Sequence, residues 1–166
     1  HELARVTGVD FSIVPSLSAM TVQTAISECG INPAARFPNE HRYASWLGLP
    51  PNNKKTGGNV FSTKTRHRPS PTGTALRLAA QSLLSSKSVL GDRFRRLRAR
   101  LGAPKAITAM AHLLAKLIYR GLTRGQVYLE AGLAALQDQS RSNTLLALHR
   151  RAHRLGFELT PLQKTA

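Results

Sequence analysis

The stretch PKAITAMAHLLAKLIY, residues Pro104–Tyr119, predicts the longest apolar helix of the chain. Its large apolar residues recur at the helical period of 3.6 and form one stripe. They are Ile107, Met110, Leu113, Leu114, Leu117 and Ile118. His112 lies off this stripe, so we expect it at the surface or in contact with the backbone. The apolar part, Ala106–Tyr119, is interrupted by His112 and Lys116 and is too short to span a bilayer.

Capping residues and apolar spacing predict further helices on both sides of this one. They cover residues 19–29 after Ser18, 40–47, 74–86, 89–101 after Ser88, and 143–155. An irregular stretch rich in Lys, Thr, Ser and Gly fills residues 50–73, and Val60-Phe61 is its candidate for a short strand or hairpin. The sequence therefore predicts a mainly α fold, a small helical domain with one long basic loop or hairpin inserted between helices.

The charge of the chain indicates polyanionic partners. Its 166 residues include 24 Lys or Arg against 8 Asp or Glu, a net charge of +16. This balance is atypical of cytosolic metabolic enzymes and favours DNA, RNA or an anionic membrane. The length allows one domain, or one domain and a tail. The single Cys29 excludes an internal disulfide and a Cys-based zinc site.

Most of the positive charge lies in the middle third of the sequence. Residues 50–105 hold thirteen Lys or Arg and a single acid, Asp92, which accounts for +12 of the +16. So unbalanced a face is more typical of a polyanion footprint than of an ordinary solvated face. Within it, Lys54–Arg66 combines two glycines, several cations and hydroxyls, as a phosphate clamp or a phosphoryl-transfer nucleophile requires. The stretch lacks the ending of a P-loop, and a flexible Gly/Lys/Thr loop is the alternative.

A second basic motif, RFRRLRAR at Arg93–Arg100, places five arginines on a predicted helix. Phe94, Leu97 and Leu101 leave one apolar face for packing, and the arginines spread over the rest. Guanidinium groups match phosphate oxygens, so we expect this helix to contact a nucleic-acid backbone rather than specific bases.

No metal site is predicted within this chain. His149 and His153 have the i,i+4 spacing of a zinc-binding pair, but no further ligand lies near them in the sequence. A solvated basic face shared with Arg150, Arg151 and Arg154 is the better interpretation. The eight carboxylates are widely scattered, which argues against a two-metal nuclease complete within these residues.

Several ordered motifs of the chain resemble one family of DNA transposases. The motifs are Arg36-Phe37-Pro38, Ala44–Leu49, Thr56-Gly57-Gly58, Ala75–Ala80, Leu90-Gly91, Arg95–Gly102, Pro104–Ala109 and Ala111-His112. The sequence is similar to the C-terminal domain of the IS-one-ten insertion-sequence transposases, especially their "eleven-eleven" branch, which is related to the Piv DNA invertase. On this basis residues 9–122 form the transposase domain, and residues 123–166 form a C-terminal helical extension and tail.

The resemblance implies a two-part enzyme of the bacterial cytoplasm, associated with the nucleoid. An N-terminal RuvC-like domain, absent from this chain, would hold Mg²⁺ on an Asp-Glu-Asp-Asp set, and no cofactor is expected in the chain itself. The C-terminal domain would supply a serine nucleophile that forms a covalent phosphoserine link with DNA. Family members act as oligomers and use a structured guide RNA, so the implied partners are DNA, guide RNA and further copies, without a membrane.

The chain departs from the family pattern in three places. Thr56 stands at the position of the nucleophilic serine, and its extra methyl group crowds an in-line attack. Pro15-Ser16-Leu17-Ser18 replaces a Pro-Gly-Ile-Gly hairpin, which would impair a turn that needs a positive φ. The RuvC-like half is missing, and the chain begins with His1. We therefore expect a piece of a longer protein, or a truncated or decayed copy.

The sequence thus predicts the C-terminal domain of a DNA transposase or site-specific recombinase that binds DNA and guide RNA. Thr56 is the expected nucleophile, and Gly57 and Gly58 shape its pocket. The expected contacts to nucleic acid are Lys54, Lys55, Gly57, Gly58, Lys64, Arg66, Arg68, Arg77, Arg93, Arg95, Arg96, Arg98 and Arg100. Alone, the chain is expected to bind without recombining. The alternative is a non-enzymatic basic RNA- or DNA-binding protein.

Overall fold

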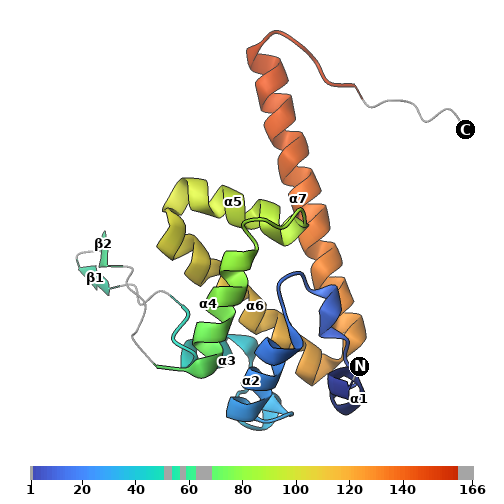
Figure 1. Ribbon diagram of the computed structural model, residues 1–166. Helices are drawn as coiled ribbons and strands as arrows, with labels where there is room; N and C mark the ends of the chain where they lie inside the picture. Colours follow the sequence, from blue (N-terminus) through green and yellow to red (C-terminus); the bar gives the residue numbers. More distant parts are fainter. Residues whose placement is uncertain (1, 51–53, 57–58, 63–68, 161–166) are drawn as a thin grey trace, which may run out of the picture.

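The computed structural model describes residues 2–50, 54–56, 59–62 and 69–160, the two short internal ranges by their backbone alone. The fold is mainly α-helical, as predicted (Figure 1). In chain order the elements are α1 (Glu2–Thr7), the 3-10 turn η1 (Phe11–Ile13), α2 (Ala19–Cys29), the 3-10 turn η2 (Pro33–Ala35), α3 (Glu40–Trp46), β1 (Lys54–Thr56), β2 (Asn59–Ser62), α4 (Pro71–Ser82), α5 (Val89–Leu101), α6 (Ala103–Arg124) and α7 (Gln126–Arg154).

The predicted apolar helix is α6, and it lies at the centre of the fold. It contacts α3, α4, α5 and α7, while α2 packs on α4 from outside. The large side chains of its stripe that are fully buried are Met110, Leu114, Leu117 and Ile118. Ile107 and Leu113 are only partly buried, whereas Ala111 and Ala115 are fully buried. Small residues let neighbouring helices approach α6 from a second side, so its buried surface is wider than the predicted stripe.

Two of the predicted helices begin and end at the predicted residues. The Ser18 hydroxyl accepts a hydrogen bond from the Thr21 amide at 3.2 Å at the start of α2, and the Ser88 hydroxyl accepts one from the Gly91 amide at 3.2 Å at the start of α5. Gly30 and Gly102 end these helices with φ values of 84° and 81°. Side-chain caps at one end and left-handed glycines at the other are strong local signals, which is why these limits could be predicted.

The limits of three other predicted helices were wrong. The helix expected at 74–86 is α4, which ends at Ser82 and begins at Pro71, because Ser70 caps it and a proline fits the first helical turn. The helix expected to end near Tyr119 continues to Arg124, where Gly125 ends it. The helix expected at 143–155 begins at Gln126, since Leu129, Leu133 and Leu136 pack its first half against the core.

Aromatic side chains fix α3 against α6. The Tyr119 hydroxyl donates a hydrogen bond to the carbonyl oxygen of Phe37 at 2.7 Å, and the Phe37 and Tyr43 rings pack edge to face with centroids 5.4 Å apart. The Trp46 ring lies against Phe37, and the Arg36 guanidinium lies 4.8 Å from the centroid of the Trp46 ring. Arg36, Phe37 and Trp46, all within motifs that suggested the family, thus stabilise the α3–α6 contact.

An ion pair crosses the same contact. The Arg120 guanidinium donates to the Glu40 carboxylate, with one nitrogen–oxygen distance of 2.8 Å, and the Lys116 ammonium lies 3.7 Å from it. Hydrogen bonding and attraction from Arg120 hold the pKa of Glu40 below its ordinary value. His112 lies nearby and is half-buried, which corrects the expectation of a surface position. Burial, together with Lys116 and His41, lowers its pKa.

The helix α7 is the longest element and extends beyond the body of the molecule. Its first half packs on α6, and its last contacts are with α5 (Figure 1). Beyond Ser140 the helix projects away from the other elements, and its residues are exposed as far as Arg151.

Candidate nucleic-acid interface

The position of α5, which carries five of the expected nucleic-acid contacts, depends on a close backbone approach. The Ser88 cap starts the helix directly after the turn that follows α4. Gly91 faces this turn so closely that a Cβ atom there would lie 2.2 Å from the carbonyl oxygen of Ser86. Phe94 is buried in the core and Leu97 is partly buried, but Leu101 is 39% exposed. The predicted packing face of α5 is therefore wrong at Leu101, which lies past the edge of the core.

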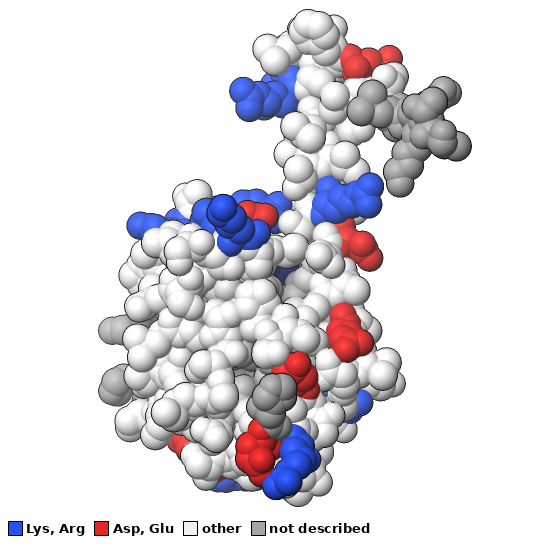
Figure 2. Space-filling view, turned by 45° about the vertical axis from the view of Figure 1, so that its right-hand side comes forward, with Lys and Arg blue, Asp and Glu red and all other residues white. Residues whose placement is uncertain are grey.

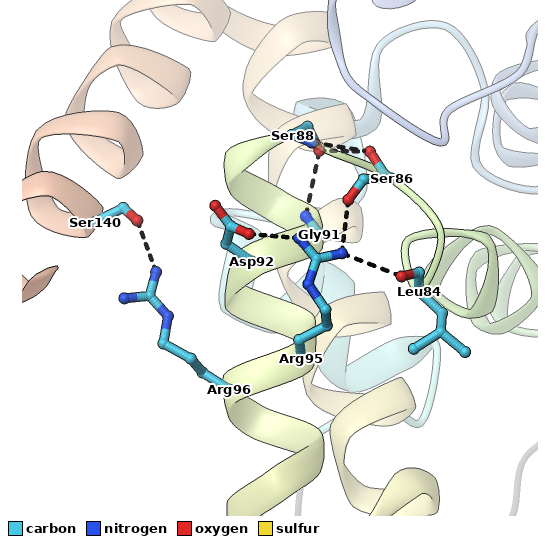
Figure 3. A network of polar contacts seen from close by, with 8 residues as sticks. All are labelled: Leu84, Ser86, Ser88, Gly91, Asp92, Arg95, Arg96 and Ser140. Atoms are coloured by element: carbon cyan, nitrogen blue, oxygen red, sulfur yellow. Dashed lines mark hydrogen bonds and ion pairs between the residues drawn. The ribbon is translucent and has the colours of Figure 1, made fainter.

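One of the five arginines, Arg95, contacts the turn between α4 and α5. The Arg95 guanidinium donates to the carbonyl oxygens of Leu84 at 3.1 Å and Ser86 at 2.7 Å, and it pairs with the Asp92 carboxylate (Figure 3). These three acceptors belong to the α4–α5 turn and the first turn of α5. Arg95 thus stabilises the turn that positions α5, and its charge is partly neutralised by Asp92.

Two further arginines face α7. The Arg93 guanidinium donates to the side-chain oxygen of Gln139 at 3.4 Å. The Arg96 guanidinium donates to the Ser140 hydroxyl at 2.6 Å, a contact drawn in Figure 3. Both partners are neutral, so the two arginines keep their full positive charge. The Arg96 side chain is exposed and that of Arg93 is partly exposed.

The arginines of α5 divide between two sides of the helix. At about 100° per residue, Arg93, Arg96 and Arg100 lie within one stripe, and Arg95 and Arg98 lie on the other side. Arg98 and Arg100 are exposed, and among the described residues neither has a hydrogen bond or an ion pair in the structure. Figure 2 shows Lys and Arg gathered on the shoulder where α5 meets α7.

Arg77 occupies a separate position on α4. Its guanidinium lies 3.5 Å from the carbonyl oxygen of Gly48, just after α3, and the side chain is partly buried. The structure therefore does not bring Arg77 together with the arginines of α5 through any contact among the described residues.

The expected nucleophile lies at the end of a short hairpin. β1 and β2 pair antiparallel, and Thr56, the last residue of β1, is opposite Asn59. Val60 and Phe61 lie in β2, as expected of a strand. The side chains of the two strands, Lys54 and Lys55 included, lie outside what the structure describes, as do the expected residues Gly57, Gly58, Lys64, Arg66 and Arg68.

The turn before α2 contains a residue in a conformation that favours glycine. Ser16 has a φ of 77°, in the left-handed region that favours glycine, and its hydroxyl is buried without a hydrogen-bond partner among the described residues. Ser18 has a φ of −82°, which any residue adopts. Of Ser16 and Ser18, only Ser16 stands where the backbone favours a glycine.

The remaining expectations concern metals and membranes. Among the residues that the structure describes, no three His, Cys, Asp or Glu side chains are close enough together to hold a metal ion. His149 and His153 are exposed on α7. Within the same described ranges, no helix is both long and apolar enough to cross a bilayer.

The sequence did not indicate that one further cluster of cations lies on a helix that contacts α5. Arg150, Arg151 and Arg154 belong to the same helix as Gln139 and Ser140, the residues that contact α5. Because the predicted helix began only at residue 143, its connection to α5 could not be recognised. The helical spacing of Leu129, Leu133 and Leu136 is the sequence signal for the earlier start of this helix.

Comparison with known proteins identifies one family. The family model described as "Transposase IS116/IS110/IS902 family" matches residues 11–95, just over half of the chain. The matched range includes the Ser16 turn, the hairpin, α4 and the first half of α5. No curated protein and no solved structure matches the chain.

Proposed function

The chain belongs to the transposase IS116/IS110/IS902 family, and we propose that it is the DNA-binding and strand-cleaving part of a transposase. The family match over residues 11–95 carries this proposal. The exposed arginines of α5 support it, because three cations against the single acid of this helix, Asp92, attract a phosphate backbone.

The finer assignment comes from the resemblance of the motifs. We place the chain in the C-terminal domain of the "eleven-eleven" branch, related to the Piv invertase, with a guide RNA and further copies as additional partners. A separate RuvC-like domain would hold Mg²⁺ on its carboxylates and polarise the phosphate there.

Thr56 is the proposed nucleophile. Its hydroxyl oxygen would form a bond to the phosphorus of a DNA phosphodiester, the bond from phosphorus to one sugar oxygen would break, and that sugar oxygen would take a proton. A hairpin end suits this role, because such a residue can approach a bound backbone from outside the helical body. Its pairing with Asn59 supports this placement.

A binding titration tests the DNA-binding half of the proposal. We expect the 166-residue chain to bind duplex DNA with an affinity that falls steeply with salt, since each neutralised phosphate contributes a slope of about 0.9. The control is Arg42→Gln/Arg141→Gln, which removes two exposed cations that do not belong to the α5 stripe. A slope near zero for the unaltered chain would contradict the proposal.

A covalent-adduct assay tests the nucleophile. The chain, joined to a RuvC-like half with Mg²⁺, is incubated with labelled DNA and separated under denaturing conditions. We expect the Thr56→Ser protein to form the adduct and the Thr56→Val protein to form none. As a control, Thr65→Val added to the Thr56→Ser protein should leave the adduct in place. If Thr56→Ser forms no adduct although the joined protein still binds DNA, Thr56 is not the nucleophile. Binding without any adduct would favour the alternative, a non-enzymatic basic nucleic-acid-binding protein.

A further inference from the structure

The second half of α7 carries Arg150, Arg151 and Arg154, called here the basic wall, beside the arginines of α5. The last contacts of α7 with the body are Gln139 and Ser140, which accept hydrogen bonds from Arg93 and Arg96. From there the helix continues to Arg154 as an exposed arm that meets α5 at a corner (Figure 1).

The helical repeat determines which residues of this arm face the corner. Eleven residues make almost three turns of an α-helix, so Arg150 lies above Gln139, and Arg151 lies above Ser140, about 16 Å along the axis. Arg154 follows one turn above Arg150 and Arg151. Because Gln139 and Ser140 both point to α5, these three arginines lie on the side of the arm that faces α5.

The other side of the corner is the arginine stripe of α5. Arg93 and Arg96 already point toward α7, and Arg100 continues the same stripe away from the corner. The corner is therefore lined by three arginines of α5 on one side and by the three arginines of the α7 arm on the other. Figure 2 shows Lys and Arg both on this shoulder and on the arm above it.

Few acids reduce this charge. Asp92 lies about 40° from Arg96 around α5, at the edge of the arginine stripe, and its carboxylate pairs with Arg95. On α7 and the segment that follows it, no acid occurs between Asp138 and Glu158. Glu158 lines a hollow at the end of α7 together with Arg150 and Arg154, whereas Arg151 lies outside this hollow. The corner as a whole is complementary to a polyanion.

We propose that this corner binds the phosphate backbone of duplex DNA, with Arg151 and Arg154 as contacts beyond those of α5. The inference rests on the proposed function, since it names a second binding surface for the same DNA. One strand of duplex DNA carries a phosphate for about every 3.4 Å along the duplex axis, so the roughly 16 Å between Ser140 and Arg151 match about five phosphates of a strand whose duplex axis runs along the arm. Arginine forks suit such repeated contacts.

The test compares two double variants of the full 166-residue chain that lose the same charge. Arg151→Gln/Arg154→Gln alters the wall, and Arg42→Gln/Arg141→Gln alters exposed cations outside the corner, because Arg141 is turned about 100° from Ser140. Glutamine retains the helix propensity of arginine. Each variant is titrated with a labelled duplex DNA at several salt concentrations, and helix content is checked by circular dichroism.

We expect the wall variant to bind duplex DNA about tenfold or more weakly at about 0.1 M salt, with a salt slope reduced by about 1.8, while the control variant keeps the affinity of the unaltered chain. Arg151→Lys/Arg154→Lys keeps the charge and is expected to restore most of the affinity, which separates charge from any loss of helix.

Two outcomes would contradict this inference and leave the proposed function intact. In the first, Arg151→Gln/Arg154→Gln binds duplex DNA as tightly as the control variant, while Arg96→Gln/Arg100→Gln binds it more weakly. In the second, Arg151→Gln/Arg154→Gln loses affinity for an RNA duplex but not for duplex DNA. If the unaltered chain itself does not bind duplex DNA, the proposed function fails together with this inference.

Discussion

Gly91 lies against the carbonyl oxygen of Ser86 so closely that no other residue fits: a Cβ atom would stand 2.2 Å from that oxygen and 3.0 Å from the carbonyl oxygen of Leu83. Both oxygens are backbone atoms, so neither can move without shifting the α4–α5 turn. The orientation of α5, and with it the arginine stripe, thus depends on the absence of a side chain at residue 91.

Gly91→Ala is expected to lower the free energy of unfolding by about 2–3 kcal/mol, because the methyl group forces backbone atoms apart. Gly132→Ala is the matched control within α7, where the nearest atom to a Cβ would be 3.6 Å away. There the gain in helix propensity should stabilise the protein by up to about 1 kcal/mol. Urea unfolding of both variants measures the difference. Equal effects at the two glycines would refute the close approach.

Ser16→Gly is expected to raise the free energy of unfolding by about 1 kcal/mol. The substitution relieves a left-handed residue with a φ of 77° and removes a hydroxyl buried without a partner among the described residues. Ser16→Ala serves as the control, because it removes the hydroxyl and keeps the strained backbone. In thermal unfolding, the Ser16→Gly protein should have a higher midpoint temperature than the Ser16→Ala protein. The reverse order would show that residue 16 is not strained.

Glu40→Gln is expected to lower the free energy of unfolding by about 1 kcal/mol at neutral pH, since it breaks the pair with Arg120. The folded protein holds the pKa of Glu40 below its ordinary value of 4.5. The stabilisation is therefore present above pH 4.5 and disappears as the pH falls through the lower pKa of the folded state. The difference between the two proteins should shrink below pH 4.5 in urea titrations. A difference independent of pH would rule out the ion pair as its cause.

Tyr119→Phe is expected to lower the free energy of unfolding by about 1–2 kcal/mol. The carbonyl oxygen of Phe37 would lose the buried hydroxyl donor that lies 2.7 Å away. Tyr128→Phe is the control, since Tyr128 is 54% exposed. It should leave the unfolding midpoint nearly unchanged. Differential scanning calorimetry compares the two, and a similar shift for both would contradict the role of the buried hydrogen bond.

Arg95→Gln and Arg100→Gln should separate two roles that look alike in the sequence. Arg95 donates to two carbonyl oxygens of the α4–α5 turn, so its loss is expected to cost about 1–2 kcal/mol of stability. Arg100 is exposed and should affect stability little while weakening duplex DNA binding. Unfolding and binding are measured on each variant. A destabilised Arg100→Gln protein with unaltered DNA binding would invert this assignment.

Local signals account for what could be predicted at the candidate site. The Ser88 cap, the Gly102 stop and the run of arginines between them are sufficient to place α5 at its observed limits. The roles of the individual arginines could not be predicted, because they depend on residues far along the chain. The roles of Arg95 and Arg93 differ because Arg95 donates to the carbonyl oxygen of Ser86 in the α4–α5 turn, whereas Arg93 donates to Gln139 of α7.

The order of the amino acids is enough to predict the helical class of the fold, the limits of α2 and α5, the concentration of positive charge and the likeness to a transposase family. These features depend on composition or on contacts within a few residues, so they can be read along the chain. The tertiary structure was needed to show that Arg95 stabilises a turn, that Ser16 occupies a glycine conformation, and that α7 extends past α5 to form a basic corner. Packing between distant segments sets each of these, and periodicity along one segment carries no information about which neighbour it will meet.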